Sequence, residues 1–231
     1  MRGFITFIFL FLSLSTFSQS KGIKFIYTTT QDIPNGVLKM ENETVRNIVI
    51  DKIKKDKKVY SLIVSNGASL FHKDSTSMDA TPLKIDTRNI YINKNEDLKL
   101  EQIYYRGKLY LIKTKYKTEK WNLTQEQDTI NGFLCYKATL KDKNNLSFIA
   151  WFTPKIPIDI APLGHNGLPG LVVRMETPVY VLNLEKIDEL ENVTIDIPKK
   201  GICLTEEKLK KNADKDLEYL LKTADSVKEY K

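Results

Sequence analysis

Residues 98–115, LKLEQIYYRGKLYLIKTK, alternate apolar and polar side chains on both sides of a short turn at 106–108. This alternation is typical of half-buried strands, and a three-residue connection that contains glycine is typical of a hairpin. Because such short turns cannot carry the long crossovers that parallel strands need, the segment predicts an antiparallel sheet.

The same pattern extends in both directions along the chain. After the hairpin, alternating runs predict strands at 118–123, 133–140, 147–153, 170–176, 179–187 and 193–197, with a turn near Thr177-Pro178. Before the hairpin, β-branched and aromatic residues predict strands at 21–29, 59–64 and 68–72, the last two joined by the turn signal Asn66-Gly67. The polar stretch 73–87 predicts a loop.

Two segments indicate helices instead. Residues 42–58 place apolar side chains at helical spacing behind a cap at Asn42 or Thr44, although Ile48-Val49-Ile50 would also suit a strand; we favour a short helix. A hydroxyl cap at Thr205 and an apolar stripe predict a C-terminal helix. Since no linker divides the chain, we expect one α+β domain over 19–231: a curved antiparallel sheet, open or a half barrel, with these two helices.

The N-terminus has the features of an export signal. Residues 1–18, MRGFITFIFLFLSLSTFS, combine one cation, an apolar run and small residues at Thr16 and Ser18. This arrangement is typical of a signal peptide, and the run is shorter than the ~20 residues of a membrane span. We therefore expect an exported protein, periplasmic or secreted, whose mature chain has no transmembrane segment.

Charge and composition limit the kinds of molecule that we expect this protein to bind. The formal net charge is +7, and the excess lysines are dispersed or grouped without the interleaved aromatics that stack on bases. We therefore expect no nucleic-acid partner, attribute the charge to solubility or to attraction by an anionic surface, and expect a monomer.

The two cysteines, Cys135 and Cys203, leave two possibilities open. Export places them where a disulfide can form, and a bond across so long a loop would stabilise the fold by about 4 kcal/mol. The alternative is two separate thiols, since Cys135 lies in an expected strand and Cys203 near the start of the expected C-terminal helix.

Catalytic chemistry lacks its usual parts. The chain has two histidines, His72 and His165, and none of the sequence motifs of metalloproteases, zinc ribbons, serine hydrolases or phosphate-binding loops. Cys135 with His165 is the one nucleophile and base pair to consider, but burial in a strand would blunt the thiol. We expect no catalytic residues, no cofactor and no metal site, and interpret His165 as an unliganded surface histidine.

One hexapeptide and its surroundings carry a resemblance. Gly167-Leu168-Pro169-Gly170-Leu171-Val172 follows, in order, Trp121, a Gly-x-x-Cys-x-x-Ala strand at 132–138, and Trp151 with Ile156-Pro157. This order of motifs resembles the GLPGLI family of exported bacterial proteins, whose molecular function is unassigned. The chain departs from the family in having Ala161-Pro162 where Gly-Pro is usual. The resemblance implies export and a β-rich fold.

The hexapeptide itself predicts a rigid corner. Its glycines permit backbone conformations that other residues avoid, and its proline fixes φ. On this interpretation Gly170→Val should lower the folded yield, because a β-branched residue resists positive φ. The candidate binding or motif residues are Gly167, Leu168, Pro169, Gly170, Leu171, Trp121, Trp151 and Pro157.

Two functions remain as hypotheses. The first is a non-catalytic binding or carrier module of the cell envelope for an apolar ligand or an extended peptide. The second is an envelope interaction or assembly protein that docks on an outer-membrane or surface complex through an edge strand or the rigid corner.

Overall fold

The computed structural model describes residues 21–212 apart from residues 32, 34, 56, 75–85, 106, 143, 144, 206 and 209. The expected signal peptide and most of the expected C-terminal helix lie outside the described residues. At the start of that helix, the N–H of Lys208 donates to Oγ1 of Thr205 at 3.3 Å, and residues 207, 208 and 210–212 are helical. The hydroxyl cap expected at Thr205 is therefore present.

Strands dominate the described part of the chain, with two short helices and one 3-10 turn. The helical elements are α1 (Asn35–Leu38), α2 (Glu43–Lys55) and η1 (Pro162–Gly164). The strands are β1 (Gly22–Thr30), β2 (Val59–Ser65), β3 (Ala68–Lys73), β4 (Asp86–Asn93), β5 (Leu98–Tyr105), β6 (Lys108–Lys115), β7 (Asn122–Ile130), β8 (Phe133–Lys141), β9 (Ser147–Thr153), β10 (Leu171–Glu176), β11 (Val181–Leu190) and β12 (Ile202–Cys203).

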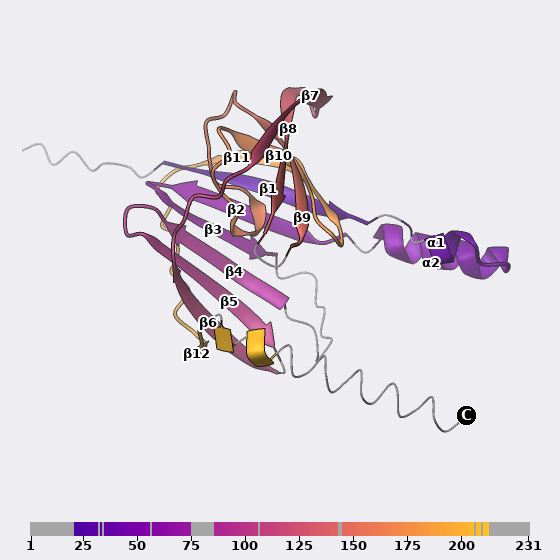
Figure 1. Ribbon diagram of the computed structural model, residues 1–231, viewed down its shortest axis with the longest axis horizontal. Helices are drawn as coiled ribbons and strands as arrows, with labels where there is room; N and C mark the ends of the chain where they lie inside the picture. The colour runs from indigo at the N-terminus through magenta and orange to yellow at the C-terminus, as the bar shows by residue number, and fades with distance from the viewer. Residues whose placement is uncertain are drawn as a thin grey trace, which may run out of the picture.

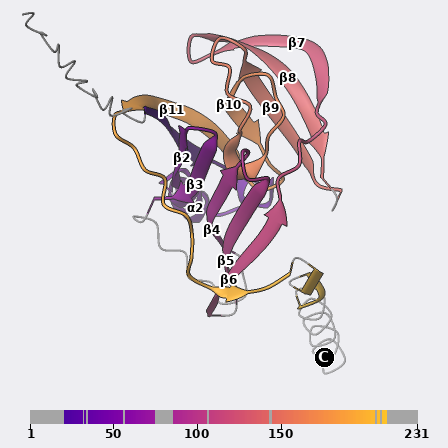
Figure 2. The ribbon, with the colours of Figure 1, turned by 90° about the vertical axis from the view of Figure 1, so that its left-hand side faces the viewer.

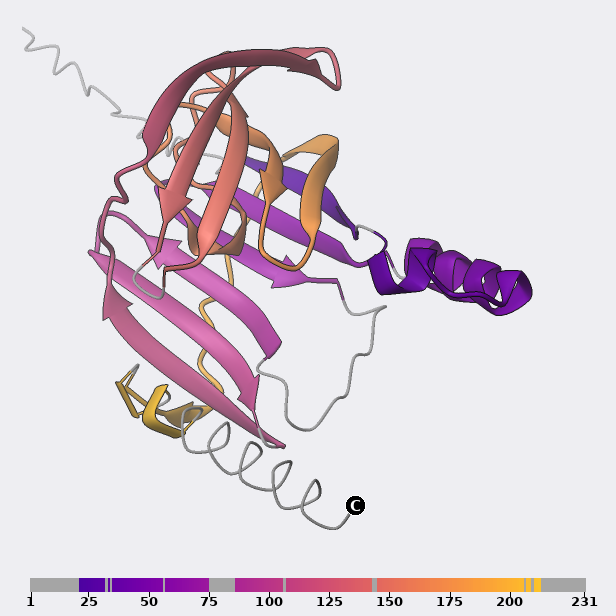
Figure 3. The same ribbon diagram turned by 45° about the vertical axis from the view of Figure 1, so that its right-hand side comes forward.

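These described strands form one open sheet in the order β12-β6-β5-β4-β3-β2-β1-β11-β10-β9-β8-β7 (Figure 1). All neighbours pair antiparallel except β12, which lies parallel to β6 over two residues. The sheet bends, so that its β7–β10 end turns away from the plane of β2–β6 (Figures 2 and 3). The expected class, a β-dominated curved antiparallel sheet with few helices, is confirmed.

Local turn chemistry sets the register of the hairpins. Asn66 and Gly67 have φ of 49° and 78°, the left-handed pair that a tight two-residue turn requires, and Ser65 pairs with Ala68. The hairpin expected at 98–115 is present, with Leu98 opposite Lys115. Short-range sequence signals were sufficient to predict both hairpins, because a turn of only a few residues closes each of them.

The core lies between the two parts of the bent sheet. Buried residues of β1–β4 and of β8–β11 belong to one cluster, with Phe25, Leu62, Phe152 and Met175 among them. Tyr27 is fully buried, and its hydroxyl donates to the carbonyl of Val172 at 2.7 Å, so a polar group also links the two parts.

Within the ambiguous segment 42–58, residues 43–55 form the helix α2. The side chain of Asn42 accepts a hydrogen bond from the N–H of Val45 at 3.0 Å, so Asn42 is the cap of α2. The short helix α1 was not expected, because its first two residues, Asn35 and Gly36, come directly after Pro34 and are typical of a turn. Together α1 and α2 project from one end of the sheet (Figures 1 and 3).

Three expectations at strand boundaries are wrong. Residues 118–121 form no strand, because the loop described below holds them as a linker; β7 begins at Asn122 instead. Residues 193–197 also form no strand. Ile202–Cys203, where no strand was expected, pairs with β6 just before the start of the C-terminal helix. Residues 86 and 87, expected in a loop, start β4, where their neighbours are residues of β5.

The two cysteines are free thiols, so the possible disulfide is not formed. Cys135 is buried in β8, next to one edge strand of the sheet, whereas Cys203 is exposed in β12, which is the opposite edge strand. Nine strands of the described sheet lie between β12 and β8 in the strand order, and a disulfide needs Cα atoms within about 7 Å.

No described helix combines the length and the hydropathy that a membrane-spanning helix needs.

Candidate functional site

The hexapeptide follows η1 and leads directly into β10. Leu168, Leu171 and Val172 are buried, which anchors the loop in the core, while Pro169 is exposed. Gly167 has φ of 90°, and a Cβ there would lie 2.6 Å from the carbonyl oxygen of Glu119. Glycine is therefore needed at 167 for both its conformation and the close approach of the Glu119 backbone.

Gly170 is needed for a different reason from the one that the sequence suggested. Its φ lies outside the positive range, but a Cβ there would lie 2.2 Å from the carbonyl oxygen of Thr153 and 2.8 Å from Cα of Pro154. Close backbone packing, not positive φ, excludes a side chain at 170. Ala161 likewise has φ of −109°, which alanine adopts without strain, and the positive φ values fall on Leu163 and Gly164 instead.

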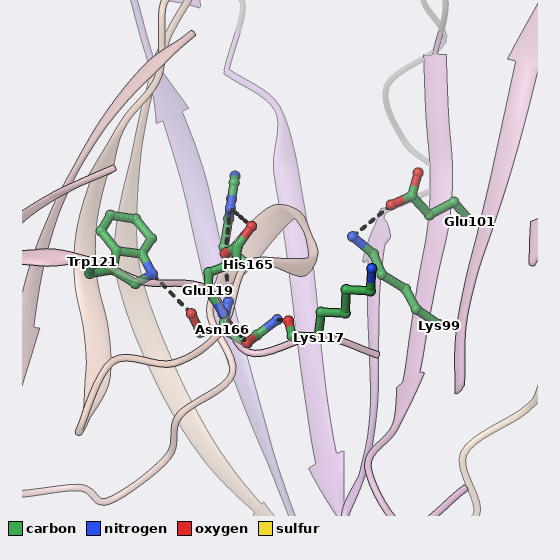
Figure 4. Close-up of polar contacts among 7 residues, drawn as sticks. All are labelled: Lys99, Glu101, Lys117, Glu119, Trp121, His165 and Asn166. Carbon is green, nitrogen blue, oxygen red and sulfur yellow. Dashed lines mark hydrogen bonds and ion pairs between the residues drawn. The ribbon is translucent and has the colours of Figure 1, made fainter. Parts of the chain in front are cut away.

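The loop that precedes the hexapeptide holds the linker between β6 and β7 (residues 116–121). The side chain of Asn166 accepts from the N–H of Glu119 and donates to the carbonyl of Lys117, both at 3.1 Å. The indole N–H of Trp121 donates to the carbonyl of Asn166 at 2.9 Å (Figure 4). Since Asn166 is 3% exposed, these bonds are shielded from water and fix the path of the linker.

The imidazole ring of His165 contacts the carboxylate of Glu119 at the same place. Nδ1 of His165 lies 2.9 Å from Oε2 and 3.1 Å from Oε1 of Glu119, and the N–H of Asn166 donates to Oε2 at 3.1 Å. The ring of His165 packs 4.6 Å from that of Phe148 and 5.9 Å from that of Trp121. The expected surface position of His165 is therefore wrong, since the residue is 9% exposed and has a carboxylate partner.

Lys99 and Glu101 complete a group of seven residues that we call the Glu119 cluster: Lys99, Glu101, Lys117, Glu119, Trp121, His165 and Asn166 (Figure 4). Lys99 and Glu101, both on β5, form an ion pair of 2.7 Å. Burial raises the pKa of Glu119, but the hydrogen bond and charge of His165, the N–H of Asn166 and the charge of Lys99 lower it by more. The net pKa lies below its ordinary value, so this carboxyl stays ionised.

This shift predicts a loss of stability in acid. Because the folded carboxyl of Glu119 binds its proton less readily than the unfolded one, its contribution is present above pH 4.5, the ordinary pKa, and is lost as pH falls through the lower folded value. We expect Glu119→Gln to be less stable than wild type at neutral pH and to show a flatter decline below pH 4.5. Urea unfolding across this pH range measures the free energy of unfolding of both proteins and its dependence on pH.

Glu126→Gln is the matched control, since Glu126 is an exposed carboxylate outside the cluster. An acid profile of Glu119→Gln that is as steep as that of wild type would contradict the role assigned to Glu119.

Two adjoining surface hollows flank the cluster and share Lys99, Glu101 and Glu119. The first, of about 570 Å³, is lined by Lys99, Glu101, Glu119, Lys120, Leu140, Lys141, Asp142, Phe148, Leu163 and His165. The second, of about 520 Å³, is lined by Lys99, Glu101, Ile112, Thr114, Lys115, Lys117, Glu119 and Asn166. We call this pair the double hollow. Charges of both signs line it, together with the apolar side chains of Ile112, Leu140, Phe148 and Leu163.

The structure brings together only some of the candidate residues. Trp121 belongs to the Glu119 cluster, and Gly167 lies next to it. Trp151 lies elsewhere: it is half-buried in β9, with Nζ of Lys137 at 5.8 Å from its ring. Pro157 is exposed after β9. Sequence reasoning missed Glu119 and Asn166. Glu119 lay inside an expected strand, and no local pattern marks an asparagine whose partners are distant in the chain.

The nucleophile considered in the sequence does not meet its base. Cys135 is 0% exposed, and its thiol donates to the carbonyl of Phe133 at 3.4 Å, while the ring of His165 contacts Glu119. Burial raises the pKa of the Cys135 thiol, with only partial compensation by a backbone hydrogen bond. Among the described residues, no group of three or more His, Cys, Asp or Glu side chains is arranged to hold a metal ion.

The fold and site define an open, bent antiparallel sheet whose linker is fixed by a buried asparagine and whose surface carries a charged double hollow. No protein-family model matches the chain, and no curated protein matches it. Two solved structures of PNGF-II, in space groups P21 and C2, have the same fold, with TM-scores of 0.56 and 0.55 and 12% identity in each case. They cover 83% and 84% of this chain, which in turn spans 32% of each PNGF-II chain.

Proposed function

We propose that this protein is a non-catalytic binding module that acts in the cell envelope after export and holds an extended peptide in the double hollow. The observation that carries the proposal is the double hollow itself, two spaces of about 570 and 520 Å³ that share Lys99, Glu101 and Glu119 in their linings. Ligand sites in proteins occupy about 300–1,000 Å³. The occurrence of this fold as 32% of a longer chain in PNGF-II is consistent with a module.

The lining favours a peptide over an apolar ligand. Lysines and acidic residues form most of the walls, and burying a purely apolar molecule against them would desolvate charges without compensation. An extended peptide offers amide groups and side chains of both signs to these charges, and apolar side chains to Leu140, Phe148 and Leu163. The fixed linker keeps Glu119 and Lys120 in place, which lowers the entropic cost of binding.

A binding role also fits the chemistry of the lining better than catalysis does. His165 contacts a carboxylate, as a general base often does, but the residues that line its hollow include no serine, threonine or cysteine to activate. Phe148 and Trp121 pack against the imidazole ring, so His165 has the surroundings of a group that orients the linker.

A second candidate function rests on the edge strand β7. This strand ends the described sheet opposite β12, most of its residues are exposed, and one of its backbone edges has no strand partner. Such an edge accepts an extended segment of another protein by strand addition. We propose docking of an envelope protein at β7 as the alternative to peptide binding in the double hollow.

Native mass spectrometry of the protein purified after export tests the first proposal. We expect an excess mass in the range of a peptide that disappears on denaturation. In the variant Lys120→Glu/Lys141→Glu, occupancy should fall roughly tenfold, because losing two exposed attractions and replacing them with repulsions changes the binding free energy by about 1 kcal/mol or more.

The matched control is Lys113→Glu, which changes an exposed lysine of β6 that lines neither hollow. A bare mass for the wild-type protein, or equal occupancy in the double variant, would contradict peptide binding at this site and favour the β7 edge.

A further inference from the structure

The helical pair α1–α2 exposes several large apolar side chains to solvent. None of the thirteen residues of α2 is buried. Four large apolar residues of the α1–α2 region are exposed to solvent, with Ile48 the most open at 63%: Leu38, Met40, Val45 and Ile48. In Figure 3 the pair extends beyond the end of the sheet. The sheet therefore does not explain why these side chains are apolar.

One face of α2 combines apolar and cationic side chains. Val45, Ile48, Lys52 and Lys55 follow at intervals of three, four and three residues, which places them along a single stripe of the helix. Ile48, Lys52 and Lys55 also line a surface hollow of about 740 Å³ beside the helix. The stripe is apolar at its N-terminal end and cationic at its C-terminal end.

The charge around this stripe is strongly positive. From residue 46 to residue 58 the chain has six cations and two acidic residues. The last turn of α2 is basic, with Lys52, Lys54 and Lys55. Lysine side chains lie with their alkyl stems along an apolar surface and their ammonium groups at its polar boundary. An exposed helix face with both apolar and cationic groups is complementary to the surface of an anionic bilayer, where acyl chains lie beneath negatively charged headgroups.

The base of the helical pair is fixed to the sheet. The N–H of Thr29 donates to the carbonyl of Lys58, and the N–H of Lys58 donates to Oγ1 of Thr29, both at 2.9 Å. These bonds tie the residue that precedes β2 to β1. The pair is thus held at a defined position at the end of the sheet, away from the double hollow, which involves β5 and the loop after β9.

We propose that the stripe Val45, Ile48, Lys52 and Lys55 binds the surface of an anionic lipid bilayer. Val45 and Ile48 enter the boundary between headgroups and acyl chains, and the two lysines contact lipid phosphates. This contact brings the protein to a membrane without spanning it and leaves the double hollow free. The inference does not depend on peptide binding, because it uses a different surface.

Cosedimentation of the exported, purified protein with vesicles tests this inference. We expect binding to vesicles of phosphatidylglycerol and phosphatidylcholine in equal parts, weaker binding to pure phosphatidylcholine, and a loss of binding as salt is raised. Lys52→Glu/Lys55→Glu should reduce the partition coefficient at least about tenfold, since each basic residue near an anionic surface contributes about fivefold. Ile48→Asp should reduce it by a similar factor.

The control variants are Val179→Asp, at an exposed apolar residue in the turn between β10 and β11, and Lys113→Glu on β6. Both should bind vesicles like wild type. Because Ile48 and the two lysines are not buried, their variants should fold, and circular dichroism verifies this. Equal binding to both vesicle types, no binding to either, or unchanged binding of the stripe variants would overturn the inference. A dimer that the Ile48→Asp variant abolishes would overturn it as well, by assigning the face to a second copy.

Discussion

Replacing Gly170 with valine is expected to destabilise the protein by about 3–5 kcal/mol, so that little folded protein accumulates. The first added carbon would lie 2.2 Å from the carbonyl oxygen and 2.6 Å from the carbonyl carbon of Thr153. These are backbone atoms at the end of β9, which pairs with β10, so relief requires separating two strands rather than rotating a side chain. In a domain of this size the melting temperature should fall by roughly 6–20 °C.

The variant Gly170→Ala distinguishes this explanation from one based on backbone conformation or branching. Alanine introduces the same Cβ, so a clash at that atom predicts a loss of stability nearly as large as that of valine. If the β-branching of valine were the cause, the alanine variant would be as stable as wild type. Gly36→Ala is the control, because a Cβ at Gly36 in α1 would meet no atom within 4 Å. If Gly170→Ala melted like wild type, the close packing assigned to this residue would be wrong.

Replacing Asn166 with leucine should cost about 2–3 kcal/mol and weaken peptide binding in the double hollow. Leucine has the same number and branching of side-chain heavy atoms but leaves the N–H of Glu119 and the carbonyl of Lys117 without their 3.1 Å partners. A shielded backbone group without a hydrogen bond costs about 1–3 kcal/mol. The linker would lose its fixed path, so Glu119 and Lys120 would no longer be held at the wall of the hollow. Urea unfolding and native mass spectrometry measure the two effects.

Asn183→Leu controls for the loss of an asparagine as such. Nδ2 of Asn183 donates to Oγ1 of Thr30 at an exposed position, so its replacement should change stability by less than about 0.5 kcal/mol. A similar loss for both asparagine variants would mean that Asn166 has no special role in holding the linker.

The Glu119 cluster connects the fold to the proposed function. The chain leaves β6, near one end of the sheet, and enters β7 at the other end, so the linker must cross between them. Gly167 allows that crossing by close contact, and Asn166 fixes it by hydrogen bonds. The hexapeptide region thus acts as a structural corner, and the same contacts position the charged wall of the double hollow.

Short-range patterns in the sequence were enough for most of the sheet. Alternation along 98–115, the turn at Asn66-Gly67 and the capped segment beginning at Asn42 each depend on residues within a few positions of one another. Their conformational preferences are local, so the sequence alone predicts a β-dominated antiparallel fold and favours a short helix within 42–58. The glycines of the hexapeptide were also recognisable as constrained, although not the reason at Gly170.

Tertiary structure alone decided the site. Glu119 and His165 are 46 positions apart in the sequence. They are in contact only because the strand order places the linker beside the loop that precedes β10. The same strand order places Cys135 and Cys203 near opposite edges of the sheet and prevents their pairing. Strand order and sheet curvature result from the summed packing of many distant side chains, and no local pattern contains that information.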